Sequence, residues 1–385
     1  MLKQQGDMTE VKSLIEELSL LAKRPLDSGR VMPKRVYLSE EFQAEEEKKI
    51  FSQEWVCAGR EDDIANTGDF LTYQIGYQPI IVIRLADTSI HAMANVCRHR
   101  MMRLADGRGN AKRFSCPYHG WTYGIDGKLI GAPHMECTKE FDMNEISLPS
   151  VRCETWGGWI YVTLNSEVEP VSEQLRELFP VVEKYQMDRY VSVFSEDREW
   201  DTNWKMVCEN FMEGYHLPVA HRGTVGNEFP VQDTIFDSRG SFDGFTYQCF
   251  RKPDSAPFGI AHSKNQALRG EWRRMSVMPT VFPSHMYVLA PDHLWYLSLQ
   301  PKGCSKVQIR YGAAFAPEVL ADHPDKKSFI EEFKVLLDKV QEEDRILVES
   351  IFKGAKAPLT GRGPMSWLER EIQEFVQYLA QRLTG

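Results

Sequence analysis

Two short pairs of cysteine and histidine constrain this chain more than any other feature. The first reads Cys97-Arg-His99, and the second, after sixteen intervening residues, reads Cys116-Pro-Tyr-His119. One cysteine and one histidine in each pair suit a [2Fe–2S] cluster of mixed ligation, in which two thiolates bind one iron and two imidazoles bind the other. Structural zinc is the alternative, but zinc fingers usually group their two cysteines in one pair and their two histidines in the other.

The two pairs and the string CPYHGWTY, which contains the second pair, resemble the Rieske non-haem iron oxygenases, specifically their large α subunits. The resemblance covers nearly the whole chain, because a second iron site of that family follows downstream. The ligands that it implies for a [2Fe–2S] Rieske cluster are Cys97, His99, Cys116 and His119. It also implies a mononuclear Fe(2+) centre. A Rieske cluster alone would suit an electron carrier without oxygenase activity, so the second site decides the class of protein.

A second metal site is predicted at 209–221, where His216 and His221 lie five residues apart. An iron centre that activates O2 commonly binds two histidines and one carboxylate and leaves other positions open. Residues five apart point about 140° apart on an ideal helix, so a regular helix would separate the two imidazoles. Pro218 lies between them and cannot continue the hydrogen-bond ladder. We therefore expect the helix to bend or end there and the two histidines to converge.

The carboxylate is expected on a predicted helix at 326–353. The apolar residues of its predicted buried face are Phe333, Leu337, Val340, Leu347 and Ile351. Asp344 falls on the same face, where a carboxylate is costly unless it is paired or binds a metal. Its neighbours Glu342 and Glu343 are predicted to point elsewhere, into solvent.

The helix alone leaves two explanations for Asp344, an iron ligand or a buried ion pair with a lysine or arginine. The resemblance favours the first, because Rieske oxygenases take their third iron ligand from an acidic residue on a late helix. It implies that His216, His221 and Asp344 together hold the mononuclear iron.

Glu213 precedes His216 by three residues, so its side chain can reach that imidazole. In the family, an acidic residue at this position connects the mononuclear iron to a Rieske histidine of a neighbouring subunit, and most ring-hydroxylating members have Asp there. The glutamate, and the position of Asn210 one residue closer to the histidine, are more similar to the carnitine, choline and glycine-betaine monooxygenases. An exposed helix residue without this role is the alternative for Glu213.

The chain is expected to be an α+β protein of three parts. N-terminal helices at 1–50 pack on the catalytic domain, residues 51–165 form an antiparallel β Rieske domain, and residues 166–385 form the mononuclear iron domain. Apolar spacing predicts one helix at 9–23, and Ser39 before two glutamates predicts the N-cap of a second helix. The strands predicted for the Rieske domain are 70–75, 80–85, 90–96 and 159–164.

The catalytic domain is predicted to contain one antiparallel sheet, covered by the helix at 326–353. Its predicted strands are 286–290, 294–299 and 307–315. The resemblance implies a helix-grip fold that holds the substrate between sheet and helix. Residues 222–270 have weak periodicity and many Gly, Pro and Asp residues, so we expect an active-site cap without regular structure.

Composition narrows the location and the partners. The net charge of −9 and a pI near 5.7 argue against binding to nucleic acid or to anionic membranes. No apolar run is long enough to span a bilayer, and the N-terminal residues lack the apolar region of a signal peptide. The cysteines outside the two pairs are scattered without paired spacing, as expected for reduced thiols. The expected location is the cytoplasm.

The sequence contains no G-x-G-x-x-G motif for a nicotinamide or flavin cofactor, so electrons are expected from a separate NAD(P)H-dependent reductase with flavin and iron–sulfur centres. The resemblance implies that each mononuclear iron receives electrons from a neighbour's cluster, which requires a ring oligomer, most often a homotrimer. The expected function is a terminal oxygenase component that uses O2 to hydroxylate, or oxidatively demethylate, a small organic substrate.

The sequence leaves two substrate classes open. Aromatic residues are dense in the region predicted to form the pocket, and aromatic boxes hold quaternary amines by cation–π attraction. They are Phe242, Phe245, Tyr247, Phe250, Trp272, Phe282, Tyr287, Trp295 and Tyr296. The same rings would also suit the packing of strands and cap. Hydroxylation of an aromatic acid by a mono- or dioxygenase is the alternative. The candidate anchors for its carboxylate are Arg251, Arg269, Arg273 and Arg274.

Overall fold

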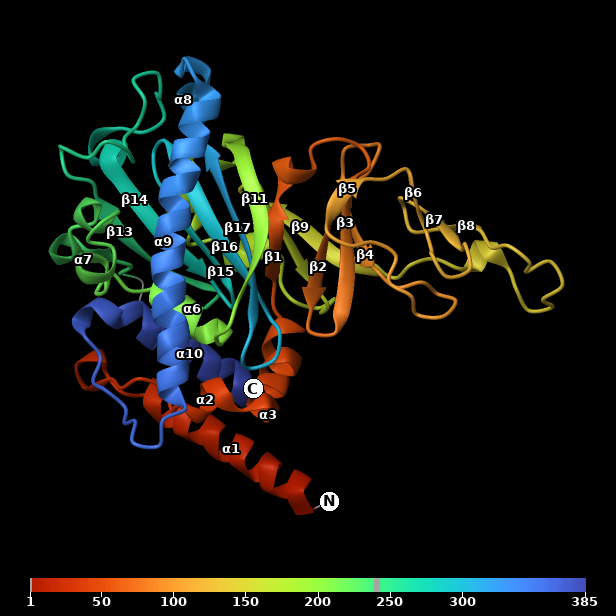
Figure 1. Ribbon diagram of the computed structural model, residues 1–385, viewed down its shortest axis with the longest axis horizontal. Coiled ribbons are helices and arrows are strands. Elements are labelled where there is room, and N and C mark those ends of the chain that lie inside the picture. Colours follow the sequence, from red (N-terminus) through yellow and green to blue (C-terminus); the bar gives the residue numbers. More distant parts are fainter. Residues whose placement is uncertain (1, 239–242) are drawn as a thin grey trace. The chain divides into compact units, whose positions relative to one another are not determined.

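The computed structural model describes residues 2–238 and 243–385, so Phe242 lies outside the described part. The chain divides into two compact units, one of Met1–Ile50 with Ser172–Gly385 and the other of Phe51–Val171 (Figure 1). Each unit is built on antiparallel sheet, and the first also contains the long helices, which confirms the α+β fold class. None of the helices in the described residues combines the length and the apolarity needed to cross a bilayer.

The unit Phe51–Val171 contains a seven-stranded and a three-stranded antiparallel sheet. The strand order in the larger sheet is β1 (Val56–Arg60), β10 (Trp159–Thr163), β9 (Ser150–Trp156), β4 (Ile90–Ala94), β3 (Gln78–Arg84), β2 (Asp69–Ile75) and β5 (Arg108–Asn110). The smaller sheet consists of β6 (Arg113–Ser115), β7 (Thr122–Gly124) and β8 (Leu129–Gly131). The four predicted strands are confirmed as β2, β3, β4 and β10. Strand β9 escapes prediction because its charged residues lie on a half-exposed strand without a clear apolar pattern.

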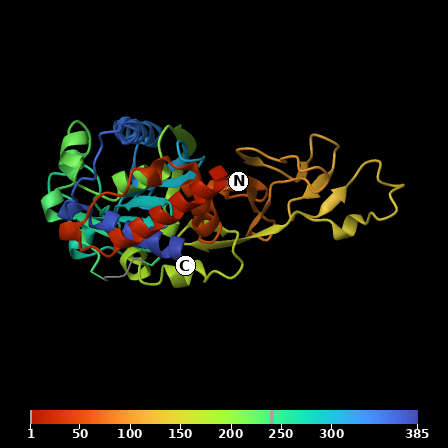
Figure 2. The same ribbon diagram turned by 90° about the horizontal axis from the view of Figure 1, so that it is seen from below.

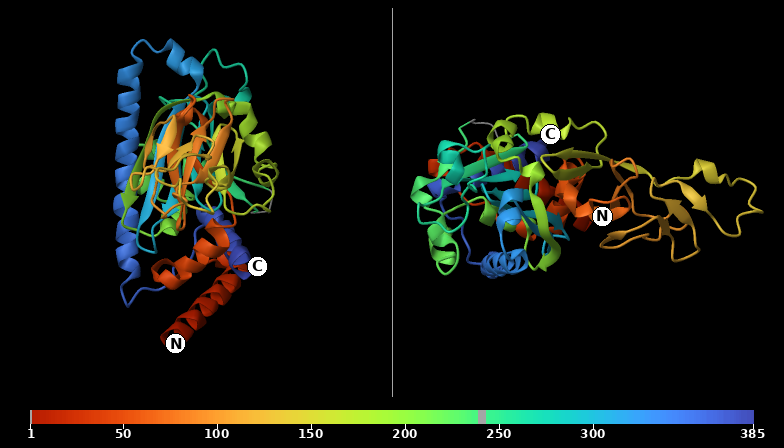
Figure 3. Two further views of the ribbon diagram at one scale, coloured as in Figure 1. Left: turned by 90° about the vertical axis from the view of Figure 1, so that its right-hand side faces the viewer. Right: turned by 90° about the horizontal axis from the view of Figure 1, so that it is seen from above.

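The second unit is built on one seven-stranded antiparallel sheet. Its strand order is β11 (Val191–Trp200), β17 (Val307–Phe315), β16 (His293–Pro301), β15 (His285–Leu289), β14 (Met275–Val281), β13 (Phe245–Arg251) and β12 (Ile235–Phe236). The three predicted strands are confirmed as β15, β16 and β17. The predicted long helix is confirmed as α9 (Lys326–Ala355). It runs alongside the sheet in Figure 3 and is seen end-on in Figure 2.

The N-terminal helices belong to the same unit as this sheet. Helix α1 (Leu2–Ala22) packs against the C-terminal helix α10 (Arg370–Thr384). Ser39 caps α3 (Glu40–Glu46), because its side chain accepts the N–H three residues later at 3.2 Å. Both predicted N-terminal helices are thus confirmed, and the second continues as a π-helical turn at Glu47–Phe51.

Helix α6 (Trp204–Phe211), which leads toward the predicted iron histidines, is fixed by a buried ion pair. The Lys205 ammonium lies 2.8 Å from the Glu46 carboxylate, and both side chains are fully buried. Asn203 caps the helix by accepting the N–H of Lys205. Removing one partner of such a pair would leave an uncompensated buried charge, so the pair holds α6 firmly in place.

The prediction of a structureless cap at 222–270 is wrong in part. Strand β13 lies within this stretch and pairs with β14 along its whole length. Most of its residues are buried, including consecutive ones that point to opposite faces of the sheet. A strand covered on both faces lacks the alternation of apolar and polar residues by which strands are recognised, so its sequence gives no clear signal.

The buried face of α9 also differs from the prediction near its C-terminal end. Leu347 and Ile351 were expected to be buried, but Ile351 is 55% exposed and Leu347 is only partly covered. Val348 and Phe352 are buried instead. Here α9 packs on α6 as well as on the sheet, and the Thr202 hydroxyl, just before α6, donates to the Val348 carbonyl. The buried face therefore turns toward α6.

Candidate metal centres

The two loops that carry the cysteine and histidine pairs share one backbone design. In each loop the cysteine carbonyl accepts the N–H four residues later at 3.0 Å. The cysteine N–H donates to the carbonyl five residues later, at 2.8 Å for Cys97 and 2.7 Å for Cys116. Each loop turns through a residue of positive φ, Met101 at 57° and Gly120 at 74°. Both tight turns leave the side chains between cysteine and turn free to point outward.

The predicted cluster ligands divide into a buried pair and an exposed pair. Cys97 and Cys116 are only 2% and 3% exposed and are free thiols. His99 and His119 are exposed, and their ring centroids lie 4.7 Å apart. His99 also stacks on the buried ring of Trp121, at 4.9 Å. Buried thiols with adjacent exposed imidazoles suit a cluster whose sulfur-bound iron lies inside and whose histidine-bound iron faces outward.

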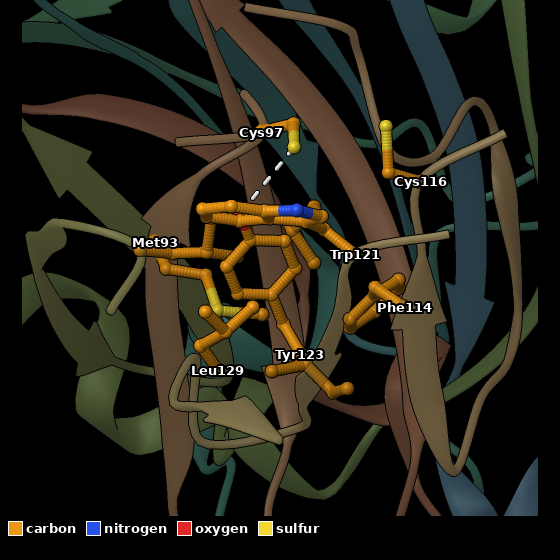
Figure 4. Packing of buried hydrophobic residues seen from close by; sticks show 10 residues of the cluster. Met93, Cys97, Phe114, Cys116, Trp121, Tyr123 and Leu129 are labelled. Atoms are coloured by element: carbon orange, nitrogen blue, oxygen red, sulfur yellow. Dashed lines mark hydrogen bonds between the residues drawn. The ribbon is translucent and has the colours of Figure 1, made fainter. Parts of the chain in front are cut away.

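Tyr123, on β7, provides a hydrogen bond to one of these sulfurs. Its hydroxyl oxygen lies 3.4 Å from Cys97 Sγ and accepts the N–H of Arg98 at 2.9 Å. Figure 4 shows the ring standing within the buried cluster of side chains that also contains Trp121 and both cysteines. Burial, followed by the hydrogen bond with Cys97, raises the pKa of Tyr123. The hydroxyl therefore stays protonated and can donate to the sulfur, a role that sequence reasoning missed.

The second site is built on a break between two helices. Helix α6 ends at Phe211, and the short helix α7 (Leu217–Ala220) follows between His216 and His221. The expectation that one helix bends or ends at Pro218 is wrong, because Pro218 instead lies in the first turn of the separate helix α7, where its missing N–H costs nothing. The two imidazoles nevertheless converge as expected, with ring centroids 5.1 Å apart.

His216, His221 and Asp344 come together as a donor set for a metal. Their ligand atoms lie within 4.8 Å of one another, and among the described residues they form the one group of this kind. Asp344 Oδ1 lies 3.6 Å from His216 Nε2 and 3.1 Å from His221 Nε2. It is nevertheless buried without a hydrogen-bond partner in the described part of the chain. Two imidazole nitrogens and an unsatisfied carboxylate oxygen facing one point fit a bound Fe(2+).

Each of these histidines is held from behind by a carboxylate. Glu213 binds His216 twice, through Nδ1 at 2.5 Å and through the backbone N–H at 3.0 Å. Glu343 lies 2.7 Å from His221 Nδ1 and accepts the Thr224 hydroxyl at 2.7 Å. The prediction that Glu343 is simply solvated is therefore wrong, because the loop after α7 brings His221 against it. An Nδ1–H that donates to a carboxylate leaves Nε2 free for a metal.

The charge balance at this centre favours a cation. Burial lowers the pKa of His221, but the negative charge of Asp344 and the hydrogen-bonded carboxylate of Glu343 outweigh burial and raise that pKa above its ordinary value. The side chain of Glu213 is only 13% exposed, so its charge is also poorly screened by water. Negative groups thus surround both imidazoles.

His216, His221 and Asp344 line a cavity of about 60 Å³ between the sheet and α9. The polar residues that line it are Asn210, Glu213, His216, His221, His293, Gln341 and Asp344. The aromatic residues that line it are Trp200, Phe211, Phe229, Phe258, Trp295 and Phe333. The remaining walls are aliphatic, and none of the described lining residues is a lysine or an arginine.

The sequence-based choice of pocket residues is largely wrong. Of the aromatic residues proposed for the pocket that lie in the described part, only Trp295 lines the cavity. Others fill the core, as Phe282 does by stacking on Tyr378 at 4.6 Å. None of the four candidate arginines lines it: Arg273 donates to backbone carbonyls, and Arg251 faces Asp254. Which face of a strand meets the cavity depends on sheet pairing, which these sequence patterns do not show.

Two family models match the chain. The model of the ring hydroxylating alpha subunit (catalytic domain) matches residues 187–385, and that of the Rieske [2Fe–2S] domain matches residues 54–142. The chain therefore belongs to the ring-hydroxylating alpha subunits of the Rieske non-haem iron oxygenases. The resemblance stated from the sequence is confirmed, together with its two cofactors, a [2Fe–2S] Rieske cluster and a mononuclear iron.

The names of individual relatives give quaternary amines as their substrates. The glycine betaine monooxygenase oxygenase subunit of Pseudomonas aeruginosa is 36% identical over 282 residues, which cover 71% of this chain but only 65% of the relative, less than two thirds of its length. The chloroplastic choline monooxygenase of Arabidopsis thaliana is 28% identical over 385 residues, covering 96% of this chain and 86% of the relative.

One solved structure with the same fold is a quaternary ammonium Rieske monooxygenase, described for carnitine oxidation by gut microbiota and for inter-subunit electron transfer. It superposes with a TM-score of 0.79 at 23% identity and covers 92% of this chain and 96% of its own.

We predict that Tyr123→Phe lowers the reduction potential of the Rieske cluster by tens of millivolts. A hydrogen bond to a cluster sulfur stabilises the more negative, reduced state, so its loss favours the oxidised state. The matched control is Tyr118→Phe, whose exposed hydroxyl lies 3.3 Å from Arg100 rather than near a thiol. Redox titration followed by visible absorbance measures both potentials. Equal potentials in wild type and Tyr123→Phe would contradict this role.

Proposed function

We propose that this chain is the terminal oxygenase component of a system that hydroxylates, and thereby demethylates, a quaternary amine. The observation that carries the proposal is the cavity, which is lined by His216, His221 and Asp344 and has no lysine or arginine among its described lining residues. The names of the relatives, glycine betaine and choline monooxygenase, support the same substrate class.

The electrostatics of the metal end favour a cationic substrate. The carboxylates of Asp344, Glu213 and Glu343 carry three negative charges in contact with the two imidazoles, against two positive charges on a ferrous ion. The site therefore keeps a negative excess that attracts a cation and opposes an aromatic carboxylate. The aromatic walls add cation–π attraction for an ammonium group that cannot donate hydrogen bonds. The aromatic-acid alternative, whether by mono- or dioxygenation, has no anchor in the described lining.

In this proposal His216, His221 and Asp344 hold the iron. The Rieske cluster is held by Cys97, His99, Cys116 and His119. When bound, the iron supplies O2 activation and the cluster supplies single electrons. The protein contributes orientation: Glu213 and Glu343 fix the imidazole rings, and the apolar cavity walls place an N-methyl group beside the metal and keep water out.

Balanced chemistry for a quaternary amine consumes one O2, two electrons and two protons. The products are one water and an N-hydroxymethyl ammonium, which releases formaldehyde, a proton and the tertiary amine. In a single turnover, the two electrons would come from the cluster that Cys97, His99, Cys116 and His119 would hold and from the iron that His216, His221 and Asp344 would hold. A separate NAD(P)H-dependent reductase with flavin and iron–sulfur centres would restore them, since the sequence has no nicotinamide or flavin motif.

We also assign the electron path between subunits to Glu213. Its carboxylate binds His216 on the side away from the metal and remains 13% exposed, so it can meet a second imidazole. In this assignment that imidazole is the exposed His119 of a neighbouring copy, and the assembly is a homotrimer. Asn210, which also lines the cavity, would help to orient the segment between α6 and α7.

The proposal also includes the bounds of the two domains and the location of the protein. Residues 51–165 would act as the Rieske domain, and residues 166–385, with helices from 1–50, as the iron domain. The two family matches at 54–142 and 187–385 support this division. The cytoplasm remains the predicted location. We also continue to expect no nucleic-acid partner and no membrane partner.

We predict that Asp344→Ala removes one iron per chain and all turnover but leaves the visible Rieske spectrum intact. The substitution deletes one of the donor atoms at the mononuclear site without touching the other unit. Asp338→Ala is the matched control, because Asp338 lies on the same helix and pairs with Arg198 and Lys334 instead of facing the cavity. The measurement is the number of iron ions per chain in each variant, together with the visible spectrum of the cluster. A full iron content in Asp344→Ala, or loss of the cluster, would exclude Asp344 as the ligand.

We predict that pre-reduced protein exposed to O2 converts a quaternary amine to formaldehyde and tertiary amine in a single turnover. A panel of glycine betaine, choline, γ-butyrobetaine and benzoate compares the two substrate classes without any need for the reductase. Formaldehyde should reach at most one equivalent per chain with at least one of the amines, and benzoate should stay unchanged. Hydroxylated benzoate, with no formaldehyde from any amine, would reverse the proposed substrate class.

We predict that Glu213→Gln keeps both metal sites occupied while electron transfer from the cluster to the mononuclear iron slows by orders of magnitude. The amide keeps the size of the side chain but loses the charge that couples two imidazoles. Glu343→Gln is the matched control, since it makes the same change behind His221, off the proposed path. Stopped-flow absorbance of cluster oxidation in a single turnover measures the rate. Equal rates in wild type and Glu213→Gln would remove Glu213 from the path.

A further inference from the structure

Gln341 is a buried amide in the lining of the catalytic cavity. It lies on α9, three residues before Asp344, and it is only 2% exposed. Residues three apart on a helix have Cβ atoms about 5–6 Å from each other. Side chains on a helix also lean toward its N-terminus, so the carboxylate of Asp344 leans toward Gln341. The amide therefore lies beside the donors for the iron.

The protein does not satisfy this amide. Within residues 2–238 and 243–385, Oε1 of Gln341 is buried without a hydrogen-bond partner. An amide that supported Asp344 would donate to its carboxylate, but Asp344 Oδ1 also has no hydrogen-bond partner in that part of the chain. The two other carboxylates of the site are already bonded to imidazoles. A buried amide is costly unless it is hydrogen-bonded, so its partner is expected inside the cavity.

The ammonium group of the proposed substrate cannot be that partner. A quaternary ammonium has no N–H, and its methyl groups make no ordinary hydrogen bond, whereas the glutamine amide offers two N–H donors and a carbonyl acceptor. The partner that fits is a small polar molecule held beside the iron donors, such as water before the reaction and O2 during it. A neutral amide also suits a cationic substrate, because it adds no positive charge that would repel the ammonium.

We propose that the amide of Gln341 donates a hydrogen bond to the small ligand that shares the iron site with the substrate. The oxygen and nitrogen of a glutamine amide exchange places by a half-turn of its terminal group, so an N–H can be directed at this ligand. The inference rests on the proposed function and deepens it, because it assigns a residue to O2 and not to the amine. A preorganised N–H at this place would stabilise negative charge that develops on O2 as electrons arrive.

The test uses nitric oxide as the probe, because it binds open positions of ferrous centres and can accept a hydrogen bond. Anaerobic, iron-loaded protein is titrated with nitric oxide, and electron paramagnetic resonance gives the dissociation constant and the shape of the signal. Gln341→Met keeps the length of the side chain but removes the amide. We expect it to retain its iron, to change the signal shape, and to raise the dissociation constant roughly three- to tenfold, the effect of one lost hydrogen bond.

Pulsed electron paramagnetic resonance in heavy water gives a second readout that repacking of the cavity would not produce. Wild type should show a coupling between the unpaired electrons of the nitric oxide complex and the exchangeable deuterons of the amide. This coupling should be absent in Gln341→Met. The wild-type measurement alone already tests the hydrogen bond, whether or not the variant folds.

The matched control is Gln300→Met. Gln300, on β16, is also a buried glutamine of this unit, but it lies outside the cavity lining, so nitric oxide binding should not change. An unchanged dissociation constant or deuteron coupling in Gln341→Met would overturn the inference and leave the proposed function standing. Loss of iron from Gln341→Met would also overturn it, because the amide would then support the iron donors. A wild type that forms no nitric oxide complex would instead refute the proposed iron site.

Discussion

The convergence of Asp344 with two imidazoles in the lining of a cavity is the constraint on which the catalytic unit depends. A carboxylate in such surroundings is expensive unless a cation or several hydrogen bonds compensate for it. Asp344 Oδ1 has no such hydrogen bond in the described structure, yet it lies within 3.6 Å of Nε2 atoms of both His216 and His221. A bound metal would compensate for this carboxylate, and the fold presents the three side chains to one point.

Several parts of the fold serve that presentation. The buried pair of Lys205 and Glu46 fixes α6, and the chain then leaves the helix at Phe211 so that α7 can bring both histidines to α9. Carboxylates behind the rings set the direction in which each Nε2 points. In the other unit, equivalent backbone turns place thiols inside and imidazoles outside, and a tyrosine hydroxyl reaches one sulfur. In both centres, therefore, side chains next to the candidate metal ligands hold those ligands in place by hydrogen bonds.

Sequence alone predicts the parts of this site that depend on spacing within a short segment. The cysteine and histidine pairs, the contact of Glu213 with His216, and Asp344 on the buried face of a long helix are all local patterns. The orientation of Glu343 toward His221 is not local, because it depends on how the loop after α7 meets α9. The identity of the aromatic residues that line the cavity is not local either, because it also depends on how distant segments pack together.

The misplaced pocket residues show where local patterns stop being informative. Trp295 faces the cavity, but the neighbouring Tyr296 points to the opposite face of β16 and bonds Ser195 at 2.8 Å. A strand alternates its side chains between two faces, and the sequence does not show which face a substrate will meet. Strand β13 and the face of α9 near Val348 were likewise decided by the elements that pack against them.

We propose that the cavity leads a quaternary amine to an iron held by His216, His221 and Asp344. Nitric oxide binds open positions of ferrous centres, so electron paramagnetic resonance of the anaerobic protein with nitric oxide reports that site directly. We expect about one nitric-oxide-bound iron per chain, with a signal whose shape changes when γ-butyrobetaine is added and does not change with benzoate. A missing signal would contradict the iron site, and a signal that is insensitive to every quaternary amine would contradict the proposed substrate class.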